Sequence, residues 1–376
     1  MEIEPQTTIS EVIYSIIIAT IVMLLLASAF SNFLIKPLTY DGTLVRSGRY
    51  SFSFEAWDSI SQHDEATIVA VGSSITQYGF NGSCIGNQNL NNNEIAFNLG
   101  IPGSYPYLDM IQTERAINSD PKLILLELNP INLAMVTGIS EDNIQLRLTL
   151  GSLHLKTSDY GGWEEILTEE HRKYIDGIFD NRYNSESLYF DDSLEEMITR
   201  YLDNHGSQEW WNKERHWYLS TPHPSDKEWD EYLSNPTLLP DYLSQLSGEE
   251  LTIYENETIP SLMQRNRYKP DLDNNLNLEA LEYMVSRFSE NGIPTLLVSY
   301  PIHPLAMDAL EASQLDEHNT SIERLQSYEE VSAVNLMWEN NFTGNDFHDY
   351  EHLNWNGRQK MCSIISNEIR ETGFKI

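Results

Sequence analysis

The chain has 376 residues, which is enough for one large domain or two ordinary ones with a sizeable hydrophobic core. Its 57 acidic and 23 basic residues give a formal net charge of -34. This charge repels nucleic acid and anionic lipid headgroups, so we expect no nucleic-acid partner. The acidic excess is spread along the whole chain, a pattern that favours the hypothesis of a halophilic source.

The first predicted element is a transmembrane helix at residues 12–35, a run of 24 positions without a charged side chain. At 1.5 Å per residue this run crosses a hydrocarbon core of about 30 Å. A cleaved signal peptide is the alternative, because "ASA" at 27–29 has a small-x-small form, but the preceding "MEIEPQTTISE" is acidic where a signal peptide carries Lys or Arg. We therefore expect a single-pass membrane protein, with residues 1–40 as tail and anchor.

Orientation of the anchor is indicated by the basic residues that follow it. Lys36, Arg46 and Arg49 all lie on its C-terminal side. The positive-inside rule then places the rest of the chain in the cytoplasm, although the rule weakens when a long domain follows the span.

Beyond the anchor, short apolar runs closed by Gly, Pro or Asn alternate with segments of helical periodicity. The runs predict strands at 66–72, 95–100, 122–129, 294–301 and 331–338, and the periodic segments predict helices at 108–118, 278–292 and 357–371. Most of the predicted strands lack polar alternation, which is typical of parallel strands covered on both faces. The pattern predicts one α/β domain over 41–376, a three-layer, doubly wound, flavodoxin-like parallel sheet preceded by the transmembrane helix.

The alternation stops between about 137 and 275, an acidic and aromatic segment without a convincing strand. We interpret it as a helical insertion with helices near 162–179 and 193–204. Its aromatic rings either pack the insertion onto the sheet or stack on a sugar-like substrate. The tryptophans in question are Trp163, Trp210, Trp211, Trp217 and Trp229.

Three loops at predicted strand ends carry residues that can do chemistry. In "GSSIT", Ser74 follows the first strand and opens a short helix ended by Gly79. In "NLGIPGSYP", Gly103 allows the backbone to approach a ligand and present its N–H. In "DFHDYEHLNWNG", Asp349 stands three residues before His352, so one turn supplies a general base and the carboxylate that orients it.

The order of these loops, with "DYEHLNWNG" as the strongest part, resembles the SGNH (GDSL-like) hydrolase superfamily through most of 66–371 outside the insertion. The resemblance implies Ser74 as nucleophile, His352 as base and Asp349 as its partner. It also implies that the backbone N–H groups of Ser74 and Gly103 form two sides of an oxyanion hole. A hydroxyl nucleophile needs an adjacent base, and a tetrahedral intermediate needs preorganised donors, so the chemistry agrees.

Two blocks depart from the family pattern. Ser73 replaces the Asp of G-D-S, as in G-S-S members that are membrane-anchored and act on envelope polymers. The G-x-N-D block is replaced by "LNPIN", which aligns Asn129 with the Gly, Ile131 with the Asn and Asn132 with the Asp. A side-chain oxyanion donor then comes from Asn129 or Asn132, or is missing.

Other residues leave alternatives open. "HDYEH" at 348–352 fits H-x-x-E-H, a zinc-protease pattern that needs a helix, whereas the surrounding Gly and Asn residues favour a loop. We therefore expect no metal and no cofactor.

His303 follows the fourth strand and either lines the substrate pocket or is structural. Cys84 and Cys362 form a disulfide or remain as two buried free thiols, and we favour the thiols.

These patterns predict a membrane-anchored SGNH-type serine esterase or O-acyltransferase that forms an acyl-enzyme. The resemblance to anchored family members implies an acylated envelope carbohydrate or glycolipid as substrate and a catalytic domain outside the cytoplasm. We follow the resemblance here against the positive-inside rule. The alternative is a catalytically inactive SGNH-fold scaffold of the cell envelope, suggested by the altered third block.

Overall fold

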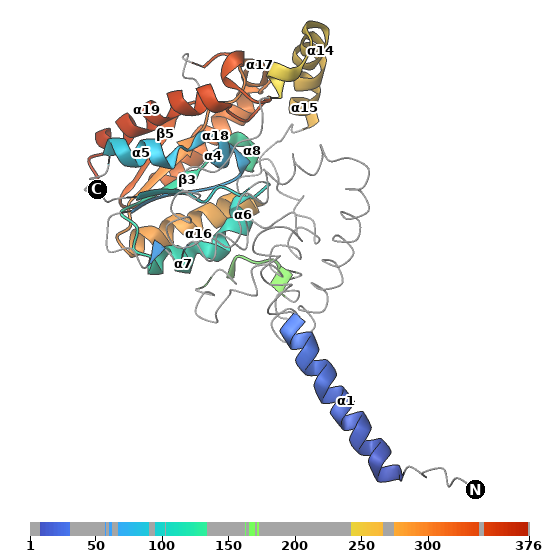
Figure 1. Cartoon of the computed structure of the whole chain (residues 1–376). Coiled ribbons are helices and arrows are strands. Elements are labelled where there is room, and N and C mark those ends of the chain that lie inside the picture. Colours follow the sequence, from blue (N-terminus) through green and yellow to red (C-terminus); the bar gives the residue numbers. More distant parts are fainter. Residues whose placement is uncertain are drawn as a thin grey trace.

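The structure is a computed structural model of the whole chain (Figure 1). It describes residues 8–30, 67–133 except 90–94 and 102, 242–265, 274–337 and 342–374, together with the short stretches 57, 60–61, 162, 165–169 and 171–172. The predicted helix at 193–204, the five tryptophans of the insertion, and Lys36, Arg46 and Arg49 lie outside these residues.

Helix α1, Ile9–Phe30, occupies the N-terminal part of the predicted span and is coloured blue in Figure 1. None of its 22 residues is buried, and the helix extends over about 33 Å at helical rise. It is the one helix among the described residues that is long and apolar enough to cross a membrane. By length and composition it fits a membrane anchor, and a signal sequence meets the same description.

The core of the fold is a five-stranded parallel sheet with the strand order β2-β1-β3-β4-β5. Each strand lies inside the apolar run that predicted it. All residues of β1, β3 and β4 are buried, as expected of strands covered on both faces. The strands are β1 Thr67–Val71, β2 Ile95–Asn98, β3 Leu123–Glu127, β4 Thr295–Ser299 and β5 Val331–Asn335.

The predicted helices at 278–292 and 357–371 are α16, Leu276–Glu290, and α19, Trp355–Glu371. The one predicted at 108–118 is divided into α6, Pro106–Asp109, the 3-10 turn η2, Met110–Gln112, and α7, Thr113–Asn118. Thr113 Oγ1 donates to Met110 O at 2.6 Å, a local bond that competes with regular helix pairing. The sequence analysis did not predict α5, Gly82–Asn89, α8, Pro130–Leu133, α17, Pro304–Asp308, or α18, Ala312–Leu325.

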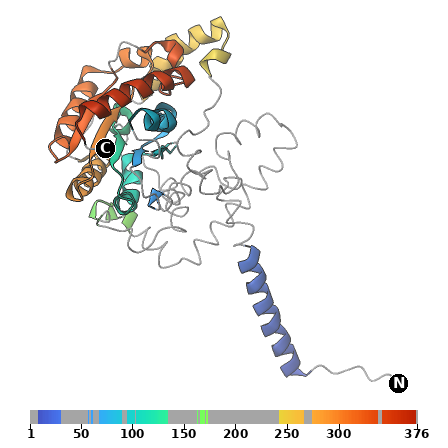
Figure 2. The ribbon, with the colours of Figure 1, turned by 60° about the vertical axis from the view of Figure 1, so that its left-hand side comes forward.

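Two hydrophobic clusters lie on opposite faces of the sheet. Along β1, Val69 and Val71 belong to one cluster, and Ile68 and Ala70 belong to the other, because successive strand side chains point to opposite faces. The first cluster packs α16, α6 and α7 against the strands, and the second packs α5 and α19 (Figure 1). Figure 2 shows the same arrangement from a view turned by 60°.

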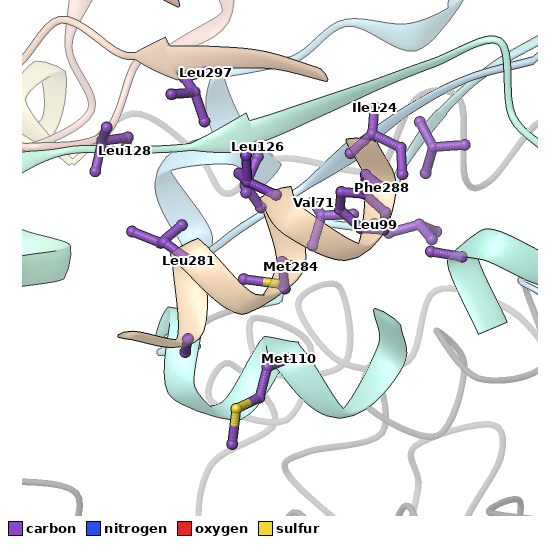
Figure 3. Close-up of a cluster of buried hydrophobic side chains, with 14 of the residues drawn as sticks. Val71, Leu99, Met110, Ile124, Leu126, Leu128, Leu281, Met284, Phe288 and Leu297 are labelled. Atoms are coloured by element: carbon purple, nitrogen blue, oxygen red, sulfur yellow. The ribbon is translucent and has the colours of Figure 1, made fainter. Parts of the chain in front are cut away.

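Figure 3 shows the first cluster at the level of side chains. Leu281, Met284 and Phe288 project from α16 toward Leu126 of β3 and Leu297 of β4. Each of these side chains is at most 2% exposed. This packing fixes the strands, so the positions of the loops at their carboxyl ends are fixed with them.

Cys84 of α5 and Cys362 of α19 form a disulfide, with their Cα atoms 6.2 Å apart. The expectation of two free thiols is wrong. The pairing was the less favoured alternative, because no local pattern relates two residues that are separated by 278 positions. They meet because α5 and α19 pack side by side over the second hydrophobic cluster.

The described part of the segment 137–275 is largely helical. It contains η5, Leu243–Gln245, α14, Gly248–Ile253, the π-helical turn η6, Tyr254–Thr258, and α15, Ile259–Arg265. Tyr254, Ile259 and Met263 are buried in the second cluster. This end of the segment therefore packs onto the α/β core.

Candidate active site

Ser74 is the first residue of the short helix α4, Ser74–Gly79, which begins directly after β1. Ser73 is the N-cap, and its Oγ accepts a hydrogen bond from the Ile75 N–H at 3.1 Å. Gly72 is required by close packing, since a Cβ at this position would lie 2.4 Å from Thr76 Oγ1 and 2.5 Å from Glu127. The sharp turn thereby presents Ser74 at the carboxyl end of the sheet.

His352 stands between Ser74 and Asp349. Its Nε2 lies 2.7 Å from Ser74 Oγ, and its Nδ1 lies 2.7 Å from Asp349 Oδ2. An ionised carboxylate only accepts hydrogen bonds, so the neutral form of the imidazole carries its proton on Nδ1, and its Nε2 then accepts from the Ser74 hydroxyl. The structure thus brings together the three residues predicted as nucleophile, base and orienting acid, and their arrangement can activate a hydroxyl.

The loop that carries Asp349 and His352 is held at both ends. A β-bridge joins Phe347 to Leu353, and the His348 N–H donates to His352 O at 2.7 Å. Asn354 then caps α19, with its Oδ1 accepting from the N–H groups of Asn356 and Gly357. These contacts hold His352 in place just before the start of α19, and the residues that make them belong to or adjoin the "HLNWNG" segment.

Asp349 is fixed inside this loop by two backbone donors. Its Oδ1 accepts from the N–H groups of Glu351, at 2.9 Å, and His352, at 2.8 Å, which leaves Oδ2 for the imidazole. Its side chain is 21% exposed and that of His352 is 13% exposed. The pair is thus shielded from water but open enough for a reactant to approach.

Charges around His352 favour its protonated form. Burial alone lowers the pKa of His352, but the charge and hydrogen bond of Asp349, with smaller contributions from Glu351 and Glu127, raise it to about 9. Burial alone raises the pKa of Asp349, but the charge of His352 and the hydrogen bonds to Asp349 lower it to about 2. The surroundings of His352 therefore stabilise an imidazolium at this position.

The "HDYEH" segment does not have the geometry of a zinc-protease motif. Residues 348–351 form bends and residue 352 has no regular secondary structure, so His348 and His352 do not share one face of a helix. His348 Nδ1 accepts instead from the Tyr242 N–H at 3.0 Å. In the part of the chain that the structure describes, no three His, Cys, Asp or Glu side chains gather as metal ligands do.

The backbone groups proposed for the oxyanion hole come from two strand-end turns. In the turn from Ile101 to Ser104, the Ser104 N–H donates to Ile101 O at 3.0 Å, and Gly103 has a φ of 65°. This backbone conformation favours glycine. In the α4 turn, among described partners, no acceptor takes the Ser74 N–H, whereas the N–H groups of Ser73, Ile75 and Thr76 are all bonded.

The side chains of Asn129 and Asn132 are bonded within the fold. Asn129 is fully buried, with Nδ2 donating to Tyr300 O at 3.0 Å and Oδ1 accepting from the Tyr300 N–H at 2.9 Å. Asn132 accepts from the Asn129 N–H at 2.7 Å and donates to Glu127 Oε1 at 2.8 Å. The Asn129 amide joins the ends of β3 and β4, and the Asn132 amide joins the start of α8 to the end of β3. Whether either amide donates to an oxyanion, or such a side-chain donor is missing, stays a prediction.

An apolar pocket of about 20 Å³ adjoins the His352 loop. Glu351 connects the two, since it lines the pocket and its Oε1 lies 3.9 Å from His352 Nε2. Burial raises the pKa of Glu351. The pocket has room for about one water-sized group, and its lining residues are Asn129, Pro130, Ile131, Met263, Ile302, Leu310, Tyr350 and Glu351.

His303 is not among the residues that line this pocket. It is the N-cap of α17, where its Nδ1 accepts from the Leu305 N–H at 3.3 Å. Its ring packs edge-on to Phe347, and a Cβ on Gly344 would lie 2.9 Å from its Nε2. Burial lowers the pKa of His303. These contacts favour the structural alternative over a role in substrate binding.

Glu127 was missed by the sequence analysis. It is the last residue of β3 and only 3% exposed, and it accepts hydrogen bonds from the turn that carries Ser74. One signal in the sequence could have revealed it, a single acidic residue near the end of the apolar run "KLILLELN". A charged side chain buried at a strand end needs hydrogen-bond partners, so such a residue indicates a polar network at that position.

The model of a protein family without a functional description matches residues 254–373. The match begins at the π-helical turn η6 and contains His303, Asp349 and His352, but not Ser74. No curated protein matches the chain. The chemistry of the site therefore has to be argued from its geometry.

Proposed function

We propose that the chain is a membrane-anchored serine esterase or O-acyltransferase of SGNH type. The observation that carries the proposal is the continuous hydrogen-bond chain from Ser74 through His352 to Asp349. The strand order β2-β1-β3-β4-β5 supports the finer fold proposal, a doubly wound, flavodoxin-like sheet in three layers. In such sheets ligands bind beyond the carboxyl ends of the strands, which is where Ser74 lies.

In the proposed mechanism, Ser74 Oγ attacks the carbonyl carbon of an ester while His352 Nε2 takes the hydroxyl proton. Asp349 stabilises the resulting imidazolium, and the Ser74 N–H donates to the developing oxyanion. As the C–O bond breaks, Nε2 returns the proton to the leaving alcohol and an acyl-enzyme remains. Water or a carbohydrate hydroxyl then attacks this ester, gives its proton to Nε2, and Ser74 leaves with that proton.

The proposed substrate is an acylated or acetylated carbohydrate or glycolipid of the cell envelope. The small size of the pocket beside Glu351 supports a short acyl group, because it accommodates about one methyl-sized group. The α1 anchor supports a substrate at or near the membrane.

We place the catalytic domain outside the cytoplasm. The Cys84–Cys362 disulfide supports this side, because disulfides persist in oxidising compartments and are rare where thiols are kept reduced. Protease added to intact cells should degrade the domain and leave a cytoplasmic control protein whole. Full protection of the domain until the cells are lysed would place it inside.

Hydrolysis of p-nitrophenyl acetate tests the activity. Wild-type protein should release a burst of p-nitrophenol followed by a slower steady rate, because an acyl-enzyme accumulates. The burst should disappear in Ser74→Ala with the protein still folded. Equal rates for the two proteins would contradict the role of Ser74.

A non-catalytic scaffold of the envelope is the second candidate. The observation that favours it is that the Asn129 and Asn132 amides are bonded within the fold, each with one of its N–H donors directed at Tyr300 O or Glu127 Oε1. Loss of one oxyanion donor typically costs about 3 to 4 kcal/mol of transition-state stabilisation. Absence of a burst from well-folded wild-type protein, from low to molar salt, would favour the scaffold.

A further inference from the structure

Glu127 is a buried carboxylate that the proposed mechanism does not use. Its Oε2 accepts from the Ser73 N–H at 2.8 Å, the Thr76 N–H at 3.0 Å and Thr76 Oγ1 at 2.6 Å. Its Oε1 accepts from Ser73 Oγ at 2.7 Å and Asn132 Nδ2 at 2.8 Å. Five donors on one side chain saturate both carboxylate oxygens, and bonds to a charged acceptor are stronger than neutral ones.

Four of these five donors belong to the turn that carries the nucleophile. The backbone N–H groups of Ser73 and Thr76 lie on either side of Ser74 in the sequence, and both point at Glu127. The Ile75 N–H is taken by Ser73 Oγ, which itself donates to Glu127. The bonds to Glu127 thus set the direction of the Ser74 N–H, the proposed oxyanion donor.

The same carboxylate joins the end of β3 to the start of α8. Asn132 bridges the two, since its Nδ2 donates to Glu127 and its Oδ1 accepts from the Asn129 N–H. The serine at position 73 fits this arrangement, because its hydroxyl donates to Glu127 Oε1. An aspartate there would place a second negative charge against the carboxylate in a buried site.

We propose that Glu127 is a positioning residue, which orients the Ser74 hydroxyl toward His352 and the Ser74 N–H toward the oxyanion. The inference rests on the proposed function and goes beyond it by assigning the preorganisation of the site to a residue that never touches substrate. The role of Glu127 explains how the 73–76 turn is held in place, although the amides of Asn129 and Asn132 make their hydrogen bonds elsewhere in the fold.

The charge of Glu127 acts on His352 as well. Among the residues that the structure describes, the charges of Asp349, Glu351 and Glu127 act on the imidazole, and the ring centroids of Tyr78 and His352 are 4.8 Å apart. Removal of the Glu127 charge should lower the pKa of His352 while Asp349 and Glu351 stay in place.

The test compares Glu127→Gln and Glu127→Leu with wild type. The glutamine side chain has two possible amide orientations. In one its NH₂ faces Asn132 Nδ2, and in the other it faces the N–H groups of Ser73 and Thr76, so in both cases two donors oppose each other and a hydrogen bond is lost. Leucine removes every acceptor. The rate constant for labelling by a fluorophosphonate should fall at least tenfold in the glutamine variant and at least a hundredfold in the leucine variant. With p-nitrophenyl acetate, kcat should fall and KM should stay within about twofold.

The matched control is Glu282→Gln. Glu282 pairs with Arg324 on the surface of α16 and touches no part of the site, so labelling should stay at the wild-type rate. Folded Glu127→Gln that labels as fast as wild type would overturn the proposal. If the leucine variant does not fold, the glutamine variant decides.

A crystal structure of Glu127→Gln, with NMR titration of His352, separates this inference from the proposed function. We expect the 73–76 turn to shift so that Ser74 Oγ leaves hydrogen-bond reach of His352 Nε2, and the pKa of His352 to fall. An unchanged turn with an unchanged pKa would overturn the role of Glu127. Both measurements apply even if wild-type protein shows no labelling, an outcome that would instead contradict the proposed function.

Discussion

His352 and His318 are both shielded histidines, yet their surroundings have opposite effects on their protonation. His352 contacts Asp349, and neighbouring carboxylates raise its pKa to about 9. His318 of α18 is 1% exposed, and its Nε2 lies 2.9 Å from Leu128 O and 3.0 Å from Ser299 Oγ. Burial without a carboxylate lowers the pKa of His318. The comparison shows that burial alone lowers the pKa of a histidine, whereas neighbouring carboxylates raise it.

The largest effect should come from removing the base. His352→Ala should reduce the rate of fluorophosphonate labelling by about 10⁴- to 10⁶-fold, because nothing else takes the Ser74 proton. The matched change His318→Gln should leave labelling within about threefold, since His318 only links the ends of β3 and β4. A similar decrease in the labelling rate of both variants would show that the two histidines do not differ in their role in the reaction of Ser74.

Removing only the orienting charge should have the next largest effect. In Asp349→Asn the amide donates to Nδ1, which moves the imidazole proton to Nε2 and prevents it from accepting the Ser74 proton. We expect labelling to fall about 10⁴-fold and the pKa of His352 to drop. A pKa of His352 that stays near 9 by NMR would show that Asp349 is not its principal partner.

The pH dependence should follow the raised pKa of His352. Since the base is the neutral imidazole, labelling should increase about tenfold per pH unit below pH 8 and level off above about 9. The contribution of His352 to the stability of the folded state has the opposite pH dependence. Its pKa is higher in the folded protein than the unfolded value of about 6.5, so protonation stabilises the folded state. This stabilisation is complete below about pH 6.5 and is lost as the pH rises to about 9. A labelling rate that levels off near pH 7 would contradict the arrangement of carboxylates.

The smallest effect should be seen in the acid stability of the His318 region. The folded state lowers the pKa of His318, so protonation favours the unfolded chain and stability falls as pH drops below about 6.5. The slope from one proton is at most about 1.4 kcal/mol per pH unit. Thermal unfolding of His318→Gln between pH 5 and 7 should show a shallower slope than wild type. Parallel curves would mean that His318 is not held neutral.

Much of the sheet could be predicted from the sequence because parallel strands are continuously apolar. Each of the five runs contains its strand, and "DYEHLNWNG" marked the Asp349–His352 loop by the caps and turns that it encodes. The triad positions were predicted from a resemblance to the SGNH hydrolases, and the residues that carry it lie in loops at the carboxyl ends of parallel strands.

The rest depended on contacts between segments that are distant in the sequence. The Cys84–Cys362 disulfide depends on how α5 packs on α19, which no local pattern encodes. The sequence left open whether an asparagine of "LNPIN" is an oxyanion donor, and it did not reveal that Asn129 pairs with Tyr300 at the end of β4. Glu127 was missed for the same reason, because its partners in the Ser74 turn lie more than fifty residues earlier in the chain.

The central claim is that Ser74 is a nucleophile activated by His352. Its most direct test is mass spectrometry of the intact, folded protein after reaction with a fluorophosphonate. The account predicts one adduct, on the peptide that contains Ser74, formed in wild type and absent from Ser74→Ala and His352→Ala. An adduct on another residue, or no adduct at any salt concentration and pH at which the protein is folded, would contradict it.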